Sequence, residues 1–127
     1  MTNQVTSTMK WIEHKGKSIL LIEYSGVDML DLEGEIHENE LATIELGKSG
    51  KTVLLFLTDV TSVHIDLAAV NAFKAATQAM EPYTMGSAVV GVHGIRRILL
   101  DAVNRFSKIE TKAFDTLDQA KEWLVSL

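Results

Sequence analysis

Ser62, His64 and Asp66 stand at alternate positions of one short stretch, residues 58–66. In an extended chain alternate side chains point to the same side, so these three could approach one another. A serine hydrolase needs its histidine between the serine and the aspartate at hydrogen-bond distance, with an oxyanion hole nearby. Neighbouring residues of one strand rarely reach that geometry, so we favour a loop that ends in an Asp66 helix N-cap. Hydrolysis through Ser62, His64 or His93 is the less favoured alternative.

Metal binding is a second chemistry open to the same region. His64, His93 and Asp66 could supply imidazole and carboxylate ligands. The chain has no cysteine, however, and no HxH or HExxH spacing. We therefore predict neither a metal site nor a cofactor.

Anion binding is a third chemistry, suggested by Gly94, Arg96 and Arg97. A helix that begins at Gly94 would present backbone N–H groups beside two guanidinium groups, which suits a small anion. Arginines at exposed helix positions are also ordinary, so this pattern is unspecific.

A glycine-rich stretch, GKSGKT at residues 47–52, resembles the end of a nucleotide-binding loop. The full motif begins with glycine, but Glu45 stands at that position. A phosphate loop also runs from a strand into a helix, whereas here a helical segment precedes and an apolar run follows. We predict a solvent-exposed turn instead, with Gly47 ending the helix and Lys48 near its negative end.

The spacing of apolar residues predicts the strands and helices that position these candidate residues. Short apolar runs predict strands, and apolar residues at i, i+3 and i+4 predict helices. Thr116 with Gln119 forms a capping box before the last helix. The predicted strands span residues 10–14, 18–24, 52–58, 86–92 and 109–114, and the predicted helices span 28–46, 67–80, 94–106 and the stretch after 116.

This order, β-β-α-β-α-β-α-β-α, predicts an α/β fold with a mostly parallel central sheet covered by helices. Lys15, Gly16 and Lys17 form the turn of an N-terminal hairpin, which supplies one antiparallel edge strand. We expect a polar N-terminal tail at residues 1–9 and a single domain at residues 10–127.

The composition of the chain excludes some classes of function. The chain has 127 residues, of which 46% are apolar, and a formal net charge of −5. That charge argues against nucleic-acid binding, and the apolar runs are too short to cross a membrane. No signal peptide is visible, so we expect a cytoplasmic protein. Acidic residues dominate residues 28–45 and basic ones dominate 94–108, which indicates solvated helix faces or an interaction surface.

In open α/β sheets, ligands bind beyond the carboxyl ends of the strands. Three segments meet at that edge in the predicted fold: residues 24–26, 58–66 and 91–94. The candidate residues for binding a ligand or partner are Tyr24, Asp59, Thr61, Ser62, His64, Asp66, His93, Gly94, Arg96 and Arg97.

The stretch LLFLTDVTSVHIDLAAV, residues 54–70, resembles the STAS domain family, which includes bacterial anti-sigma factor antagonists and domains of sulfate transporters. The likeness extends over residues 10–127 and is closest to small stand-alone antagonist-like bacterial proteins. Supporting pieces are KGKSILLIEYSG, SAVVGVHGIRRILLDAVNRF and FDTLDQAKEWL. The folding pattern is also similar to CRAL-TRIO lipid-transfer domains, which implies a possible apolar ligand.

The sequence departs from the STAS family at one position that matters for function. In switching antagonists an Asp-Ser pair begins the helix after the central strand, and phosphorylation of that serine breaks the partner complex. Asp66 matches the aspartate, but Leu67 and Ala68 follow it, so the phosphorylated hydroxyl is missing. Thr61 and Ser62 lie in the preceding loop and could be modified, though nothing marks them.

We therefore predict a non-catalytic STAS-like interaction or regulatory module that binds a protein partner or a second copy of itself. The alternative is a carrier or sensor of a small apolar, lipid-like or anionic ligand. Such a ligand would lie between helix 67–80 and the helix that follows Gly94, because residues rich in Ala and Met can adapt to an apolar guest.

Overall fold

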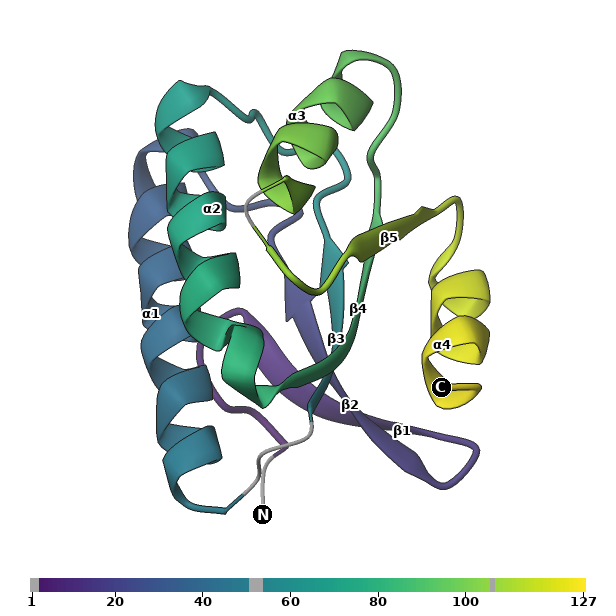
Figure 1. Cartoon of the computed structure of the whole chain (residues 1–127). Coiled ribbons are helices and arrows are strands. Elements are labelled where there is room, and N and C mark those ends of the chain that lie inside the picture. The colour runs from purple at the N-terminus through teal and green to yellow at the C-terminus, as the bar shows by residue number, and fades with distance from the viewer. Residues whose placement is uncertain (1–2, 51–53, 106) are drawn as a thin grey trace.

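The computed structural model describes residues 3–50, 54–105 and 107–127, without the side chain of Ile95. It confirms the predicted α/β class and the predicted order of elements (Figure 1). The elements are β1 (Met9–His14), β2 (Lys17–Glu23), α1 (Met29–Lys48), β3 (Leu54–Asp59), α2 (Leu67–Met80), a 3-10 helix (Glu81–Tyr83), β4 (Thr84–Val90), α3 (Ile95–Asn104), β5 (Thr111–Phe114) and α4 (Leu117–Val125).

The five strands form one sheet in the order β1-β2-β3-β4-β5. β1 and β2 are antiparallel, and every later neighbour pair is parallel, so the predicted edge hairpin is confirmed. Its turn places Lys15 at φ 50 and Gly16 at φ 79. Two positive φ angles are typical of the tight turn that matches the twist of a hairpin, and glycine adopts one of them without strain.

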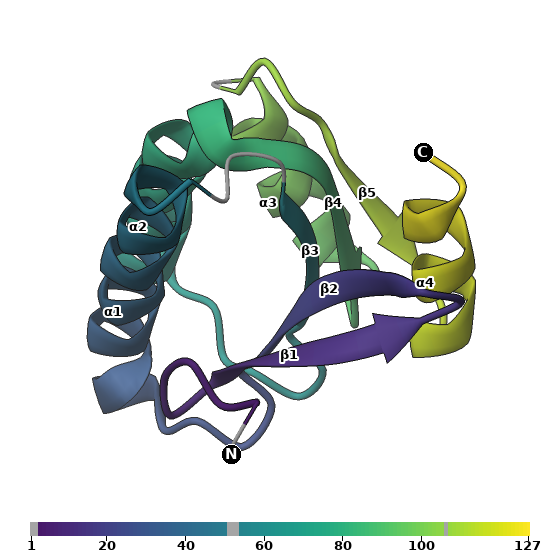
Figure 2. The ribbon, with the colours of Figure 1, turned by 90° about the horizontal axis from the view of Figure 1, so that it is seen from below.

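Helices cover both faces of the sheet, with α1, α2 and α3 on one face and α4 on the other (Figures 1 and 2). The strands face two cores because their side chains alternate. The large core contains Leu20 and Ile22 with residues of α1 and α2. The small core contains Ile19 and Leu21 with residues of α4. This double burial explains the continuous apolar runs of the inner strands.

Helix α1 corrects one prediction. It continues to Lys48, so Gly47 lies inside the helix and does not end it. A Cβ atom at position 47 would collide with the ring of Tyr83, and glycine therefore permits a close approach of the 3-10 helix. The positive φ after the helix belongs to Gly50, at 101°.

Two other predictions extend beyond the described residues. Lys51 and Thr52 of the predicted turn are outside them, although α1 does precede the segment and β3 does follow it. Helix α3 was predicted to reach Phe106, which is also outside them; its last described helical residue is Asn104.

The segment before β1 lies against α1. Thr6 donates a hydrogen bond to the Asn39 side chain, and Asn39 donates one to Thr8 at 2.8 Å. Ser7 donates to the Glu35 carboxylate at 2.8 Å. Residues 3–8, expected as part of a polar tail, are thus attached to α1 by their hydroxyl groups.

Candidate functional site

The loops at the carboxyl ends of β3 and β4 hold most of the predicted site residues. The Asp59 carboxylate accepts a hydrogen bond from the Thr61 backbone N–H at 2.9 Å. The Asp66 carboxylate accepts one from the Ala69 N–H at 2.9 Å, which is the predicted N-cap of α2. Both carboxylates therefore stabilise backbone at the two ends of the loop.

Ser62, His64 and His93 are exposed on these loops. The backbone of Ser62 is left-handed, at φ 62. Among the described residues no hydrogen bond joins Ser62, His64 and Asp66, so the structure does not assemble a Ser-His-Asp relay from them. Nor does any group of three or more His, Asp or Glu side chains suitable for a metal occur in the described part of the chain.

Arg96 and Arg97 occupy different environments although they are adjacent. Arg97 is exposed, whereas Arg96 is half-buried. The Arg96 Nη1 donates to the backbone oxygen of Val60 at 3.0 Å and to that of Gly91 at 3.1 Å. Its Nη2 donates to the backbone oxygen of Val63. Arg96 thereby ties the loops after β3 and β4 to the first turn of α3.

A cavity of about 130 Å³, partly open to the surface, lies between the sheet and helices α1, α2 and α3. For comparison, an engineered apolar cavity of roughly 150 Å³ binds benzene. The structure thus has room for an apolar group of that size inside the large core. The cavity is lined mostly by apolar side chains: Ile22, Ile36, Phe56, Val60, Ile65, Val70, Phe73, Ala76, Met80, Val89, Val92, Leu99, Leu100, Val103 and Ile109.

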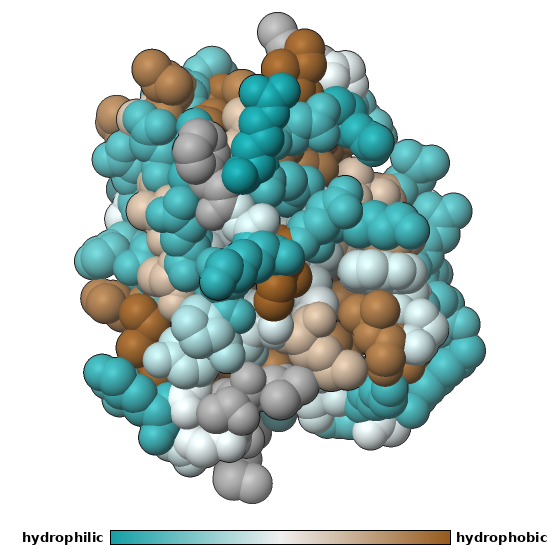
Figure 3. Space-filling view, viewed as in Figure 1, coloured by the Kyte–Doolittle hydropathy of each residue, from teal (hydrophilic) through white to brown (hydrophobic). Residues whose placement is uncertain are grey.

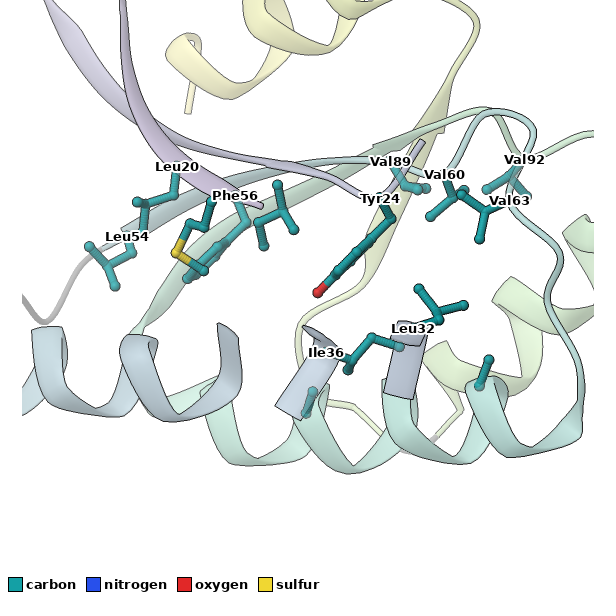
Figure 4. Packing of buried hydrophobic residues seen from close by; sticks show 14 residues of the cluster. Leu20, Tyr24, Leu32, Ile36, Leu54, Phe56, Val60, Val63, Val89 and Val92 are labelled. Atoms are coloured by element: carbon teal, nitrogen blue, oxygen red, sulfur yellow. The ribbon is translucent and has the colours of Figure 1, made fainter. Parts of the chain in front are cut away.

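Tyr24 is one of the polar residues that line this cavity. Its ring points from the sheet towards α1, as Figure 4 shows beside Leu32 and Ile36. It packs edge-on against the Phe73 ring, with 5.7 Å between the ring centroids. The Tyr24 hydroxyl accepts a hydrogen bond from Asn39 at 2.9 Å. Burial raises the pKa of the Tyr24 phenol well above its usual range, so this hydroxyl stays neutral.

Only Tyr24 and Arg96 of the predicted site residues line the cavity. Both were predicted from their place at the carboxyl edge of the sheet. Asn39 also lines the cavity and was missed, because a polar residue among the acidic residues of α1 looks solvent-exposed in the sequence. Of the remaining predicted residues, Asp59 ends β3, Arg97 lies in the first turn of α3, and the others lie in the loops after β3 and β4.

The surface near these loops carries separate hydrophobic side chains. Figure 3 shows hydrophilic residues over most of one face, with hydrophobic groups scattered among them. Leu30, Leu67 and Ile98 are 86%, 74% and 67% exposed. They lie near the starts of α1, α2 and α3, which all begin at the same end of the molecule (Figure 1). In the described residues, no helix combines the length and the apolar character needed to cross a membrane.

Comparison with known proteins adds evidence on the fold alone. Neither a protein-family model nor a curated protein matches the sequence. Among solved structures, a similar one is the crystal structure of an uncharacterized protein from the DUF3478 family, from Shewanella loihica PV-4, described as having a SpoIIAA-like fold. The TM-score is 0.66 at 16% sequence identity, over 91% of each chain. The chain therefore has a SpoIIAA-like fold, which is the STAS-like fold of anti-sigma factor antagonists.

Proposed function

We propose that this STAS-like module is non-catalytic and carries or senses a small apolar ligand in the cavity of the large core. The observation that carries the proposal is the cavity itself, about 130 Å³ and lined mostly by apolar side chains. A space of this size with mostly apolar walls can hold a small apolar molecule, as an engineered cavity of similar volume holds benzene.

The helices that enclose the cavity support this function. Helix α2 contributes Ala76 and Met80, and α3 contributes Leu99 and Leu100. Alanine leaves room beside the sheet, and the unbranched methionine side chain adapts its shape to a guest. The exposed Ser62, His64 and His93 lie outside the cavity, so they are not placed to react with a ligand bound there.

Filling the cavity tests the proposal. Ala76 is buried on α2 and lines the cavity, whereas Ala75 is exposed on the same helix. The Ala76→Leu variant should lose binding of an apolar probe such as 1-octanol at least tenfold, while keeping its fold. Ala75→Leu adds the same side chain next to it and should bind like the unchanged protein.

Native mass spectrometry of freshly purified protein provides a second measurement. A bound small molecule should appear on the unchanged protein and on Ala75→Leu, but not on Ala76→Leu. Equal binding of 1-octanol by all three proteins, or by none, would count against a ligand in this cavity.

A second candidate is a protein-interaction module in the cytoplasm, which binds a partner protein or a second copy of the chain. The exposed Leu30, Leu67 and Ile98 favour it, because all three lie near helix starts at one end of the molecule, where a partner could contact them together. Leu67→Glu should then abolish a pull-down or dimer signal. Leu41→Glu changes an exposed leucine in α1, away from the helix starts, and should leave the signal unchanged.

A further inference from the structure

The Arg96 guanidinium is a cation at the wall of a mostly apolar cavity. A guanidinium has five N–H donors. Arg96 makes three hydrogen bonds, to the backbone oxygens of Val60, Gly91 and Val63. Nη1 uses both of its N–H groups and Nη2 uses one, so one Nη2–H and the Nε–H are available to a further acceptor.

The partners of Arg96 are also all uncharged. None of the ion pairs seen among the described residues includes Arg96. A half-buried charge held by carbonyl oxygens alone has lost part of its hydration and gained no counter-ion. An anion with access to the two remaining donors would supply one.

Other polar groups of the lining are also able to donate. The Tyr24 hydroxyl accepts from Asn39, which leaves its own proton available to an acceptor. Glu81 is the one carboxylate among the lining residues, and it accepts a hydrogen bond from the Lys108 N–H. Arg96 and the Tyr24 hydroxyl can therefore both donate a hydrogen bond to the polar group of a ligand.

We propose that the ligand is a small anionic amphiphile, with an apolar tail in the cavity and a carboxylate-like headgroup at Arg96. This inference rests on the proposed function and specifies the class of ligand. A carboxylate presents two oxygens, which match two N–H donors of one guanidinium in a charge-assisted pair.

Three eight-carbon probes separate the headgroup from the tail: octanoate, 1-octanol and octylamine. Each is titrated into the protein at pH 7 and followed by calorimetry or by NMR shifts. Octanoate should bind at least tenfold more tightly than 1-octanol, and octylamine should bind most weakly of the three. This series uses the unchanged protein, so it does not depend on whether an Arg96 variant folds.

Variants then assign the preference to Arg96. Arg96→Gln should reduce octanoate binding to the level of 1-octanol while leaving 1-octanol binding unchanged. Arg96→Lys keeps the charge and should retain part of the preference. Arg97→Gln removes the exposed neighbouring charge and should change neither affinity.

The outcomes distinguish the two proposals. Equal affinity for octanoate and 1-octanol would overturn the anionic headgroup but leave the apolar cavity site in place. A preference that survives in Arg96→Gln would overturn the role of Arg96, which would then only hold the loops together. Failure of all three probes to bind would overturn the cavity site and the headgroup together.

Discussion

Tyr24 and Asn39 form a buried polar pair inside the large core. The Asn39 amide donates to the Tyr24 hydroxyl at 2.9 Å and to the Thr8 hydroxyl at 2.8 Å, and its oxygen accepts from Thr6. Each hydrogen bond removes a desolvation penalty that an unpaired amide would carry. The pair thus joins the N-terminal segment, α1 and the cavity wall.

Tyr24→Phe tests this pair. The ring and its packing on Phe73 remain, but one Asn39 N–H loses its acceptor. We expect a loss of about 1–2 kcal/mol in the free energy of unfolding at pH 7, the usual effect of one buried unpaired donor. Urea denaturation of both proteins measures it, and an unchanged midpoint would show that the hydrogen bond contributes nothing.

The raised pKa of Tyr24 also predicts how the stability of the two proteins differs with pH. Burial is the main cause of the raised pKa of Tyr24, with the negative charge of Glu35 acting in the same direction and the Asn39 hydrogen bond opposing it. Above about pH 10 the unfolded tyrosine loses its proton while the folded one keeps it. The contribution of the protonated Tyr24 to the free energy of unfolding is therefore fully present below about pH 10. Above that pH the free energy of unfolding falls, by up to about 1.4 kcal/mol per pH unit. The Tyr24→Phe variant should not show this loss of stability above pH 10. Parallel pH profiles of stability for the two proteins would contradict the prediction.

For single residues, the sequence predicted where they lie in the fold better than whether they are buried. Tyr24 was predicted because it ends a predicted strand, and Arg96 because it lies in the first turn of a predicted helix, both at the carboxyl edge of the sheet. The Asp66 cap was predictable because a short acidic side chain just before a helix bonds its first turn. The burial of Asn39 was not, because it depends on Thr6 and Thr8, which lie far from it in the sequence.

Two glycines of α1 differ in their surroundings. At Gly34 an added Cβ would meet open space, whereas at Gly47 it would collide with the Tyr83 ring. Gly34 therefore weakens the helix without a packing reason, and Gly47 allows the 3-10 helix to pack against α1.

Alanine at each position should shift stability in opposite directions. Gly34→Ala should raise the free energy of unfolding by roughly 0.5–1 kcal/mol, because alanine loses less backbone entropy. Gly47→Ala should lower it by about 1–3 kcal/mol, the usual effect of overpacking. Thermal denaturation measures both, and a stable Gly47→Ala would show that Tyr83 moves aside easily.

The order of elements was predictable because each strand run and each helix pattern is local. The end of α1 was not, because Gly47 after a helical run favours a C-terminal cap unless a neighbour approaches closely. That neighbour, Tyr83, comes from a segment beyond α2. Local patterns therefore predict the elements, and a tertiary contact explains why a glycine stands at position 47 inside this helix.

At the scale of the whole molecule, the sheet separates two cores of different character. The small core packs Ile19, Leu21 and Leu57 against Leu124 of α4. The large core lies under three helices and includes the cavity. Sequence patterns could indicate that α2 and α3 face the sheet, but an empty volume depends on how all the side chains fit together.

The most direct test of the central claim is a methyl NMR titration of the unchanged protein with 1-octanol. If the cavity is a binding site, the methyl signals of lining residues such as Ile22, Val70 and Leu100 should shift and saturate together. Those of Ile19 and Leu124 in the small core should stay in place. Absence of saturable shifts at the lining residues, or equal shifts in both cores, would contradict the claim.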